Sequence, residues 1–409
     1  MSDFVYFIQP SPVRLWGLTS VERVERLLAA YPVQRLDRLD RNLGADDSIL
    51  LMRGDYLFDD RLLPHLITTP SLILDGGEQN DTIVAVHAPG SLALQALAVA
   101  DGTASGDTLV GFTRESPATA PVAYREDLRK SETPFVLPIT MENKEKVERR
   151  LFDWSYKGIT DLVTKWLWPR PARWAVGRCV QYRIRPNQVT IVSLVLVIIA
   201  GWCFFRGQFG LGLMAGWLMT YLDTVDGKLA RVTMQSSRFG HYFDHLIDLI
   251  HPPIWYLFWG LGLGAAQRQQ LGWPLATLVI AIFAGYIVGR LVEGGFQAVL
   301  RSSFNIFCWR PIDAYFRLVT ARRNPCLILL TGSLLVGRPE LGLVAVAFWT
   351  VVTTLFLLAR LALAVVARLR QGTLTSWLAL VDRPPYRGSL AARLFTRQAE
   401  SDLGEGVRD

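Results

Sequence analysis

Four aspartates lie close together in an otherwise apolar stretch, residues 221–250. Asp223 and Asp226 are three residues apart and Asp244 and Asp248 are four apart, so each pair would share one face of a helix. An acid buried in a bilayer costs about 3 kcal/mol, so four uncompensated acids would cost roughly 10 kcal/mol. Carboxylate oxygens suit Mg²⁺, Mn²⁺ or Ca²⁺, and the absence of neighbouring cysteines argues against zinc. The spacing therefore predicts two helices that present a divalent-cation site.

Small and basic residues complete the spacing between the two acid pairs. Gly227 and Gly240 would let a bulky ligand or a second helix approach the backbone closely, and Arg231 is a candidate phosphate partner. The complete pattern resembles the signature of the CDP-alcohol phosphotransferase (CDP-alcohol phosphatidyltransferase) family, with no position missing: Asp223-x2-Asp226-Gly227-x2-Ala230-Arg231-x8-Gly240-x3-Asp244-x3-Asp248.

The resemblance implies a reaction and a role for each position. An acceptor hydroxyl attacks the β-phosphorus of a CDP-linked alcohol, which gives a phosphodiester and CMP, and two Mg²⁺ or Mn²⁺ ions neutralise the pyrophosphate. The implied metal ligands are Asp223, Asp226, Asp244 and Asp248, and Asp248 is also the implied general base. The implied nucleotide-binding residues are Asn187, Thr190, Asp223, Gly227, Ala230, Arg231 and Gly240.

Asn187 and Thr190 belong to a PN-x2-T element at residues 186–190 that also resembles the family, where it helps to hold the cytidine nucleotide. Without the resemblance, the proline would fit a helix start and the two polar residues could simply cap its backbone. Both interpretations stay open at this point.

Composition separates a soluble part from a membrane part. The 409 residues are 51% apolar, and the long apolar runs lie within 189–368. A span needs about 20 residues, and the predicted spans are 189–205, 210–230, 241–263, 273–294, 324–337 and 341–368. The fifth is short, so we expect it to begin earlier, near Tyr315.

The loops after spans one, three and five carry few basic residues, whereas the opposite side carries many. The positive-inside rule then predicts an integral protein of the cytoplasmic (inner) membrane with both termini and the active site facing the cytoplasm. The net charge of +7 suits anionic lipid head groups and gives no reason to expect nucleic acid as a partner. The four cysteines show no paired-ligand spacing, so we expect them to be reduced. No secretory signal is expected, and we expect a second copy of the chain as a partner in a homodimer.

The predicted organisation has a soluble α/β domain at 1–140, an amphipathic juxtamembrane linker at 141–182, a six-helix membrane bundle at 183–370 and a cytoplasmic tail at 371–409. The linker alternates aromatic and basic residues, as in segments that lie at the head-group level. A helix packed on the soluble domain is the alternative for this linker.

Short apolar runs of strand length alternate with helical patterns in the first 140 residues, which predicts an α/β layer fold. The predicted strands are 4–9, 48–53, 71–75, 81–88, 107–113 and 136–140. Arg53-Gly54-Asp55 resembles the strand-then-acid element of sugar-phosphate nucleotidyltransferases. However, no glycine-rich basic loop follows the first strand, so triphosphate binding would lose its main donors. We expect a degenerate, inactive domain; an active cytidylyltransferase and an unrelated α/β module are the alternatives.

Arginines at 290–323 bear on the acceptor. Arg290 and Glu293 are three residues apart and could neutralise each other. The candidates for binding an acceptor phosphate are Arg290, Arg317, Arg322 and Arg323. If they instead face lipid head groups, a free alcohol is equally allowed as acceptor. We favour a phosphorylated polyol as acceptor and CDP-diacylglycerol as donor. A soluble CDP-polyol donor and a non-catalytic membrane protein with a cation site are the alternatives.

Overall fold

The computed structural model describes residues 3–39, 43–44, 46–77, 81–120, 124–125, 128–235 and 238–396, without the side chains of 124–125 and 238–245. The chain separates into two compact units. One lies within residues 1–125 and 131–154, and the other within 126–130 and 155–397.

A six-stranded mixed sheet forms the centre of the first unit, with strand order β2-β1-β3-β6-β5-β7. Strand β6 runs antiparallel to both of its neighbours, whereas β1 is parallel to β2 and β3, and β5 is parallel to β7. The strands are β1 (Phe4–Ile8), β2 (Gln34–Arg35), β3 (Ser48–Arg53), β5 (Leu72–Asp75), β6 (Ile83–Pro89) and β7 (Thr113–Glu115).

Alternating side chains of the sheet build two apolar cores. Leu50 and Met52 pack with helices α1 (Ser20–Leu28) and α2 (Leu62–Thr68) on one face. Ile49 and Leu51 pack with α3 (Ala93–Ala100) on the other. The period of two in β3 thus places helices on both faces of the sheet, and the prediction of an α/β fold is confirmed.

The predicted strands at 4–9, 48–53, 71–75 and 81–88 agree with the structure to within two residues, and 136–140 corresponds to β10 (Val136–Pro138). The predicted strand at 107–113 is wrong, because this segment forms the 3-10 turn η2 (Gly106–Thr108) and the strand begins at Thr113. Ser105 caps that turn by accepting a hydrogen bond from the Asp107 N–H, a local bond that competes with strand pairing. The remaining elements here are β4 (Tyr56–Phe58), η1 (Gly90–Leu92), β8 (Tyr124–Arg125), β9 (Lys130–Ser131) and α4 (Lys144–Trp154).

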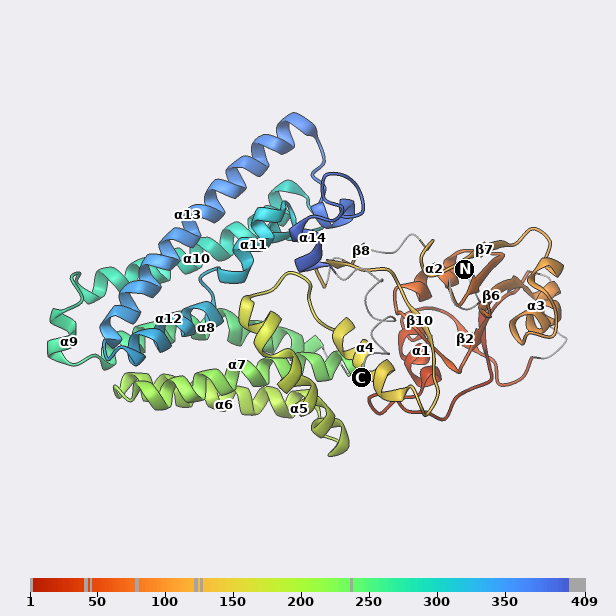
Figure 1. Ribbon diagram of the computed structural model, residues 1–409, viewed down its shortest axis with the longest axis horizontal. Coiled ribbons are helices and arrows are strands. Elements are labelled where there is room, and N and C mark those ends of the chain that lie inside the picture. The colour runs from red at the N-terminus through yellow and green to blue at the C-terminus, as the bar shows by residue number, and fades with distance from the viewer. Residues whose placement is uncertain are drawn as a thin grey trace, which may run out of the picture. The chain divides into compact units, whose positions relative to one another are not determined.

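The second unit is helical (Figure 1). Helix α6 (Pro186–Phe205) lies alongside α7 (Phe209–Val232) and α8 (Arg238–Gly262), and α10 (Leu275–Leu300) lies alongside α13 (Pro339–Gln371). The other elements are η3 (Val163–Leu167), α5 (Pro169–Gln181), α9 (Ala265–Gln269), η4 (Ile306–Cys308), α11 (Pro311–Val319), α12 (Arg323–Leu335), η5 (Trp377–Leu380) and α14 (Leu390–Phe395).

Helices occupy all six predicted spans, but among the described residues three are long and apolar enough to cross a membrane: α6, α10 and α13. Helix α7 ends in a charged segment, and α12 has only 13 residues. The expected start near Tyr315 is wrong, because Tyr315 lies in the separate helix α11. Thr320 and Arg322 are extended between α11 and α12, which breaks the helix there.

Aromatic side chains hold the helical core together. Trp255 donates from its indole N–H to the Val197 carbonyl at 2.9 Å, which ties α8 to α6.

A Cβ on Gly262 would lie 1.9 Å from the Phe204 carbonyl oxygen, so only glycine allows the two backbones to approach this closely.

Candidate active site

The first acid pair lies on α7, three residues apart. Asp226 is 5% exposed, and the hydroxyl of Thr190 on α6 donates to its Oδ2 at 2.7 Å. Thr190 therefore does more than cap its own helix, because it joins the PN-x2-T element to an acid of the long pattern. Asn187 has an exposed side chain at the start of α6.

Asp248 lies on α8 four residues before Pro252. A proline has no N–H, so the Asp248 carbonyl loses its usual partner in the helix. The Tyr286 hydroxyl on α10 donates to this carbonyl at 3.0 Å, and Arg290 in turn donates to the Tyr286 oxygen at 3.0 Å. This chain of contacts fixes the backbone of Asp248.

Arg323, the first residue of α12, joins the two acid-bearing helices. Its guanidinium donates to Oδ2 of Asp223 on α7 and to Oδ1 of Asp248 on α8. These two carboxylates therefore face one shared position that already holds a cationic group, and their oxygens are the donors that Mg²⁺ and Mn²⁺ prefer. The residues fit a divalent cation on this ground.

Two positions of the pattern fall on side chains that the structure does not describe, Gly240 and Asp244. The backbone of α8 places Asp244 one turn before Asp248. Within the described part of the chain no group of three or more His, Cys, Asp or Glu side chains could hold a metal ion.

Three consecutive residues at the start of α12 each contact a different element. Arg322 pairs with Glu293 on α10, and Arg323 pairs with the acids of α7 and α8. Asn324 donates from Nδ2 to Oδ1 of Asp161 at 2.9 Å. Arg322 makes the direct ion pair with Glu293, whereas Arg290 hydrogen-bonds to Tyr286 and interacts with Glu293 through its charge.

Of the four candidate acceptor arginines, Arg317 on α11 differs from the rest. It is 8% exposed, and its Nε and Nη1 atoms are buried without a hydrogen-bond partner among the described residues. Its guanidinium lies 5.6 Å from the centre of the Phe307 ring. Unused buried donors of this kind suit an anion.

The proposed nucleotide side of the site lies one turn further along α7. The guanidinium of Arg231 folds back over Gly227, where a Cβ would lie 3.2 Å from its Nη2. Gly227 therefore leaves the space that the arginine occupies, and Ala230 beside it is half-buried.

Lys228 is a buried residue whose contacts the sequence did not indicate. It is 3% exposed, its Nζ donates to the Ser155 carbonyl at 3.1 Å, and it lies 3.4 Å from the centre of the Tyr156 ring. A lysine between the acids and Arg231 of the pattern was the available signal, because a buried lysine requires a partner.

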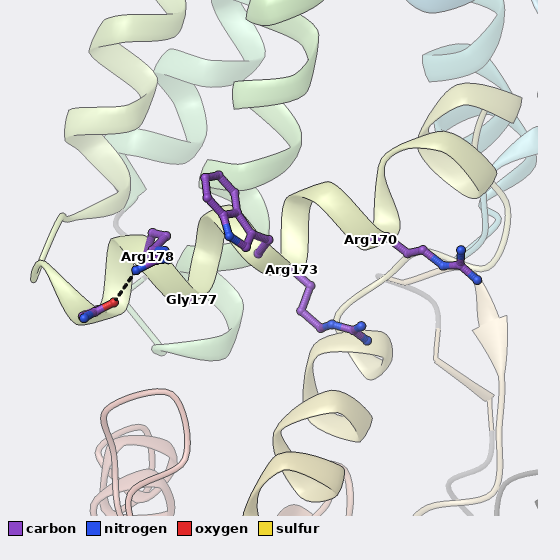
Figure 2. A pocket seen from close by; sticks show the side chains of 6 residues that line it. Arg170, Arg173, Gly177 and Arg178 are labelled. Carbon is purple, nitrogen blue, oxygen red and sulfur yellow. Dashed lines mark hydrogen bonds between the residues drawn. The ribbon is translucent and has the colours of Figure 1, made fainter. Parts of the chain in front are cut away.

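Helix α5 presents a basic outer surface (Figure 2). Arg170, Arg173, Arg178 and the 65% exposed Trp174 line an open depression of about 470 Å³. Ala172, Val176 and Cys179 of the same helix are buried. This amphipathic division agrees with the predicted head-group position of the linker.

An apolar groove of about 530 Å³ runs along α6 and α8. Its lining includes Ile198 and Trp202 on α6 and Ile250 and Phe258 on α8. Ile247, the neighbour of Asp248 in the sequence, also lines it. An apolar chain could therefore lie along α8 close to this acid.

Two acids of the soluble unit, Asp55 and Asp59, are held by arginines two residues away. Arg53 donates to both oxygens of Asp55 at 2.9 and 2.6 Å, and Arg61 binds Asp59 at 2.7 Å. Both carboxylate oxygens of Asp55, the acid of the nucleotidyltransferase-like element, thus accept hydrogen bonds from the nearby Arg53.

Taken together, the apolar helices and the acids that converge between α7, α8 and α12 define a helical membrane enzyme. Residues 183–381 match the sequence model of the CDP-alcohol phosphatidyltransferase family. The recognition made from the aspartate pattern is confirmed, and the members of this family are enzymes.

Individual relatives cover smaller parts. An archaetidylinositol phosphate synthase of Pyrococcus horikoshii is 33% identical over 104 residues, 25% of this chain and 53% of that protein. A bifunctional IPC transferase and DIPP synthase of Thermococcus kodakarensis is 28% identical over 131 residues, 29% of this chain and 30% of that protein. Cholinephosphotransferase 1 of Xenopus laevis is 26% identical over 167 residues, 36% of this chain and 38% of that protein. The chain thus spans about half, or less, of the length of these relatives.

Proposed function

We propose that this protein transfers a substituted phosphate from CDP-diacylglycerol to the hydroxyl of a phosphorylated polyol and releases CMP. The observation that carries the proposal is the meeting of Asp223 and Asp248 at Arg323, because it joins the two halves of the family pattern in space. The alternative of a cation pathway is disfavoured, since a pathway needs polar residues across the whole bilayer.

Asp223, Asp226, Asp244 and Asp248 would hold two Mg²⁺ or Mn²⁺ ions. The ions would supply charge neutralisation at the pyrophosphate and at the attacking and leaving oxygens. In this assignment Arg231, with Asn187, Thr190, Gly227, Ala230 and Gly240, binds the nucleotide side of the donor.

Asp248 acts as the general base in this proposal. Its backbone is held by Tyr286 while its carboxylate stays 37% exposed, so an entering hydroxyl can reach it. A carboxylate in this position is a suitable group to accept a proton from the hydroxyl.

The donor assignment rests on the groove along α6 and α8. Its lining is almost wholly apolar, as acyl chains require, and it begins beside Asp248. A soluble CDP-polyol would leave this surface without a substrate role.

The acceptor assignment rests on Arg317, whose unused buried donors suit a phosphate group. One relative bears the name archaetidylinositol phosphate synthase, which agrees with a phosphorylated polyol. We also propose six membrane spans in the cytoplasmic membrane, cytoplasmic termini and a homodimer, as the positive charge distribution and the resemblance suggest.

The test incubates the purified protein and Mg²⁺ with radiolabelled CDP-diacylglycerol or a labelled CDP-polyol, each with myo-inositol 1-phosphate, glycerol 3-phosphate or the free alcohols. CMP release and a labelled lipid product with a phosphorylated acceptor are expected. A product that stays in the water phase would favour the CDP-polyol alternative, and no CMP with any pair would contradict the proposed function.

A further inference from the structure

A short segment that precedes the family domain, residues 155–158, belongs to the helical unit. This segment is held on both sides of Lys157. On one side, Lys228 of α7 holds Ser155 and Tyr156 by the contacts described above. On the other side, the Gly158 N–H donates to the Leu128 carbonyl at 2.9 Å.

Gly158 has no room for a side chain. A Cβ there would lie 2.7 Å from the Arg129 carbonyl oxygen and 2.8 Å from the Phe395 carbonyl oxygen. Lys165 also donates to the Gly158 carbonyl at 3.1 Å. Both neighbours of Lys157 are therefore fixed, and so is the point from which its side chain leaves the backbone.

Lys157 carries its charge among other cations. Desolvation and the charges of Arg129, Arg231, Arg317 and Arg322 together lower its pKa to about 8. Lys157 is exposed. A soluble anion can therefore reach its ammonium group.

Arg129, whose carbonyl approaches Gly158, adopts a φ of 50°, which residues with a side chain rarely adopt. Such strain persists only where the surrounding structure enforces it. The contact of its carbonyl with Gly158 belongs to that enforcement.

The nearby acids already have partners. Asp161 and Glu293 act on Arg317, but Asp161 is bound by Asn324 and Thr164, and Glu293 is paired with Arg322. Positive charge is therefore in excess around Arg317, and a bound anion would restore the balance.

We propose that Lys157 and Arg129 bind the phosphoryl group of the acceptor together with Arg317. The inference rests on the proposed function, in which the acceptor is a phosphorylated polyol. A segment N-terminal to the family domain then completes the acceptor site and favours phosphorylated over free alcohols.

The pyrophosphate of the donor is the competing anion, and Arg231 lies on that side. The two anions are separated by measuring the KM for each substrate. Lys157→Gln and Arg129→Gln should each raise the KM for myo-inositol 1-phosphate by about tenfold, the size expected for one charge-assisted contact, with the KM for CDP-diacylglycerol unchanged.

Lys157→Arg keeps the charge and should stay near wild type, and Lys146→Gln removes a charge from an exposed position of α4 as the matched control. Calorimetric titration of the full-length protein with myo-inositol 1-phosphate, without donor, gives a second readout. Affinity should fall as pH rises through about 8, because the Lys157 ammonium loses its charge there among Arg129, Arg231, Arg317 and Arg322, and Lys157→Arg should flatten this profile.

An unchanged acceptor KM and affinity in Lys157→Gln would overturn the inference, and so would a rise confined to the donor KM. If the wild type releases no CMP with any acceptor, the proposed function fails by itself. The calorimetric comparison still decides whether Lys157 binds the phosphorylated probe.

Discussion

Two carboxylate–arginine pairs of the soluble unit and the one that joins α7, α8 and α12 differ in the distance along the chain between the partners. In the soluble unit Arg53 and Asp55 are two residues apart, as are Asp59 and Arg61. In the helical unit Arg323 reaches Asp248 across 75 residues and Asp223 across 100. A local pair needs only a strand or a turn, whereas the distant one forms only when three helices are in place. In the local pairs each carboxylate is neutralised by a residue two positions away, whereas the distant pairing marks a site that the fold assembles.

The largest difference between the units should appear on removing one carboxylate from each. Asp223→Asn or Asp226→Asn should lower CMP release by more than about 100-fold, because even groups that only support a metal ligand cost 10–100-fold. Asp55→Asn in the soluble unit should leave the rate unchanged. Wild-type turnover in either α7 variant would contradict the assignment.

Asp248→Asn separates chemistry from binding inside the helical site. Turnover should fall by about 100-fold or more, since a general base is needed for the chemical step. Donor affinity by calorimetric titration should remain. If binding and turnover are lost together, Asp248 acts chiefly as a metal ligand.

Arg317→Ala should raise the KM for a phosphorylated acceptor by about tenfold, as the loss of a charge-assisted contact requires. Arg322→Ala should have a similar effect if Arg322 also reaches the acceptor, although it removes the partner of Glu293 as well. Arg301→Ala, at an exposed position after α10, is the control. Equal KM values in all three variants and the wild type would leave these arginines with a role in topology only.

Arg323, whose partners are distant in the sequence, and Arg53, whose partner is local, should also differ in how much they contribute to stability. Arg323→Gln leaves two acids facing each other, and in EDTA it should lower the melting temperature by about 5 °C. Mg²⁺ should restore most of this loss, because a cation can then neutralise the same acids. Arg53→Gln should change it by no more than about 2 °C, since Asp55 remains open to water. If Arg323→Gln lowers the melting temperature equally with and without Mg²⁺, this would contradict the assignment of the acids around Arg323 to a metal site.

No cytidylyltransferase activity is expected from the soluble unit. The full-length protein should release no pyrophosphate from CTP with myo-inositol 1-phosphate or glycerol 3-phosphate, because the soluble unit lacks the phosphate-binding loop. A coupled pyrophosphate assay with an active cytidylyltransferase as positive control measures this. Sustained release would overturn the prediction of an inactive domain.

The aspartate pattern was readable from the sequence because spacing along one helix fixes which residues share a face. The helices that cover the sheet could be read for the same reason. The contacts of Arg322, Arg323 and Asn324 could not, since their partners lie on other elements and spacing says nothing of how helices cross. Lys157 was likewise hidden, because the groups around it come from distant parts of the chain. The Tyr286 contact with Asp248 had one local signal, the proline four residues later.

The start of α12 has a consequence for how such chains can vary. Arg323 and Asn324 point about 100° apart around the helix axis, and the extended Arg322 before them meets a third partner. A substitution changes one of these contacts, whereas the insertion or deletion of a single residue just before them would rotate all three onto the wrong partners. We therefore expect chains that share this site to vary in length in other loops and to keep the 320–324 segment free of insertions and deletions.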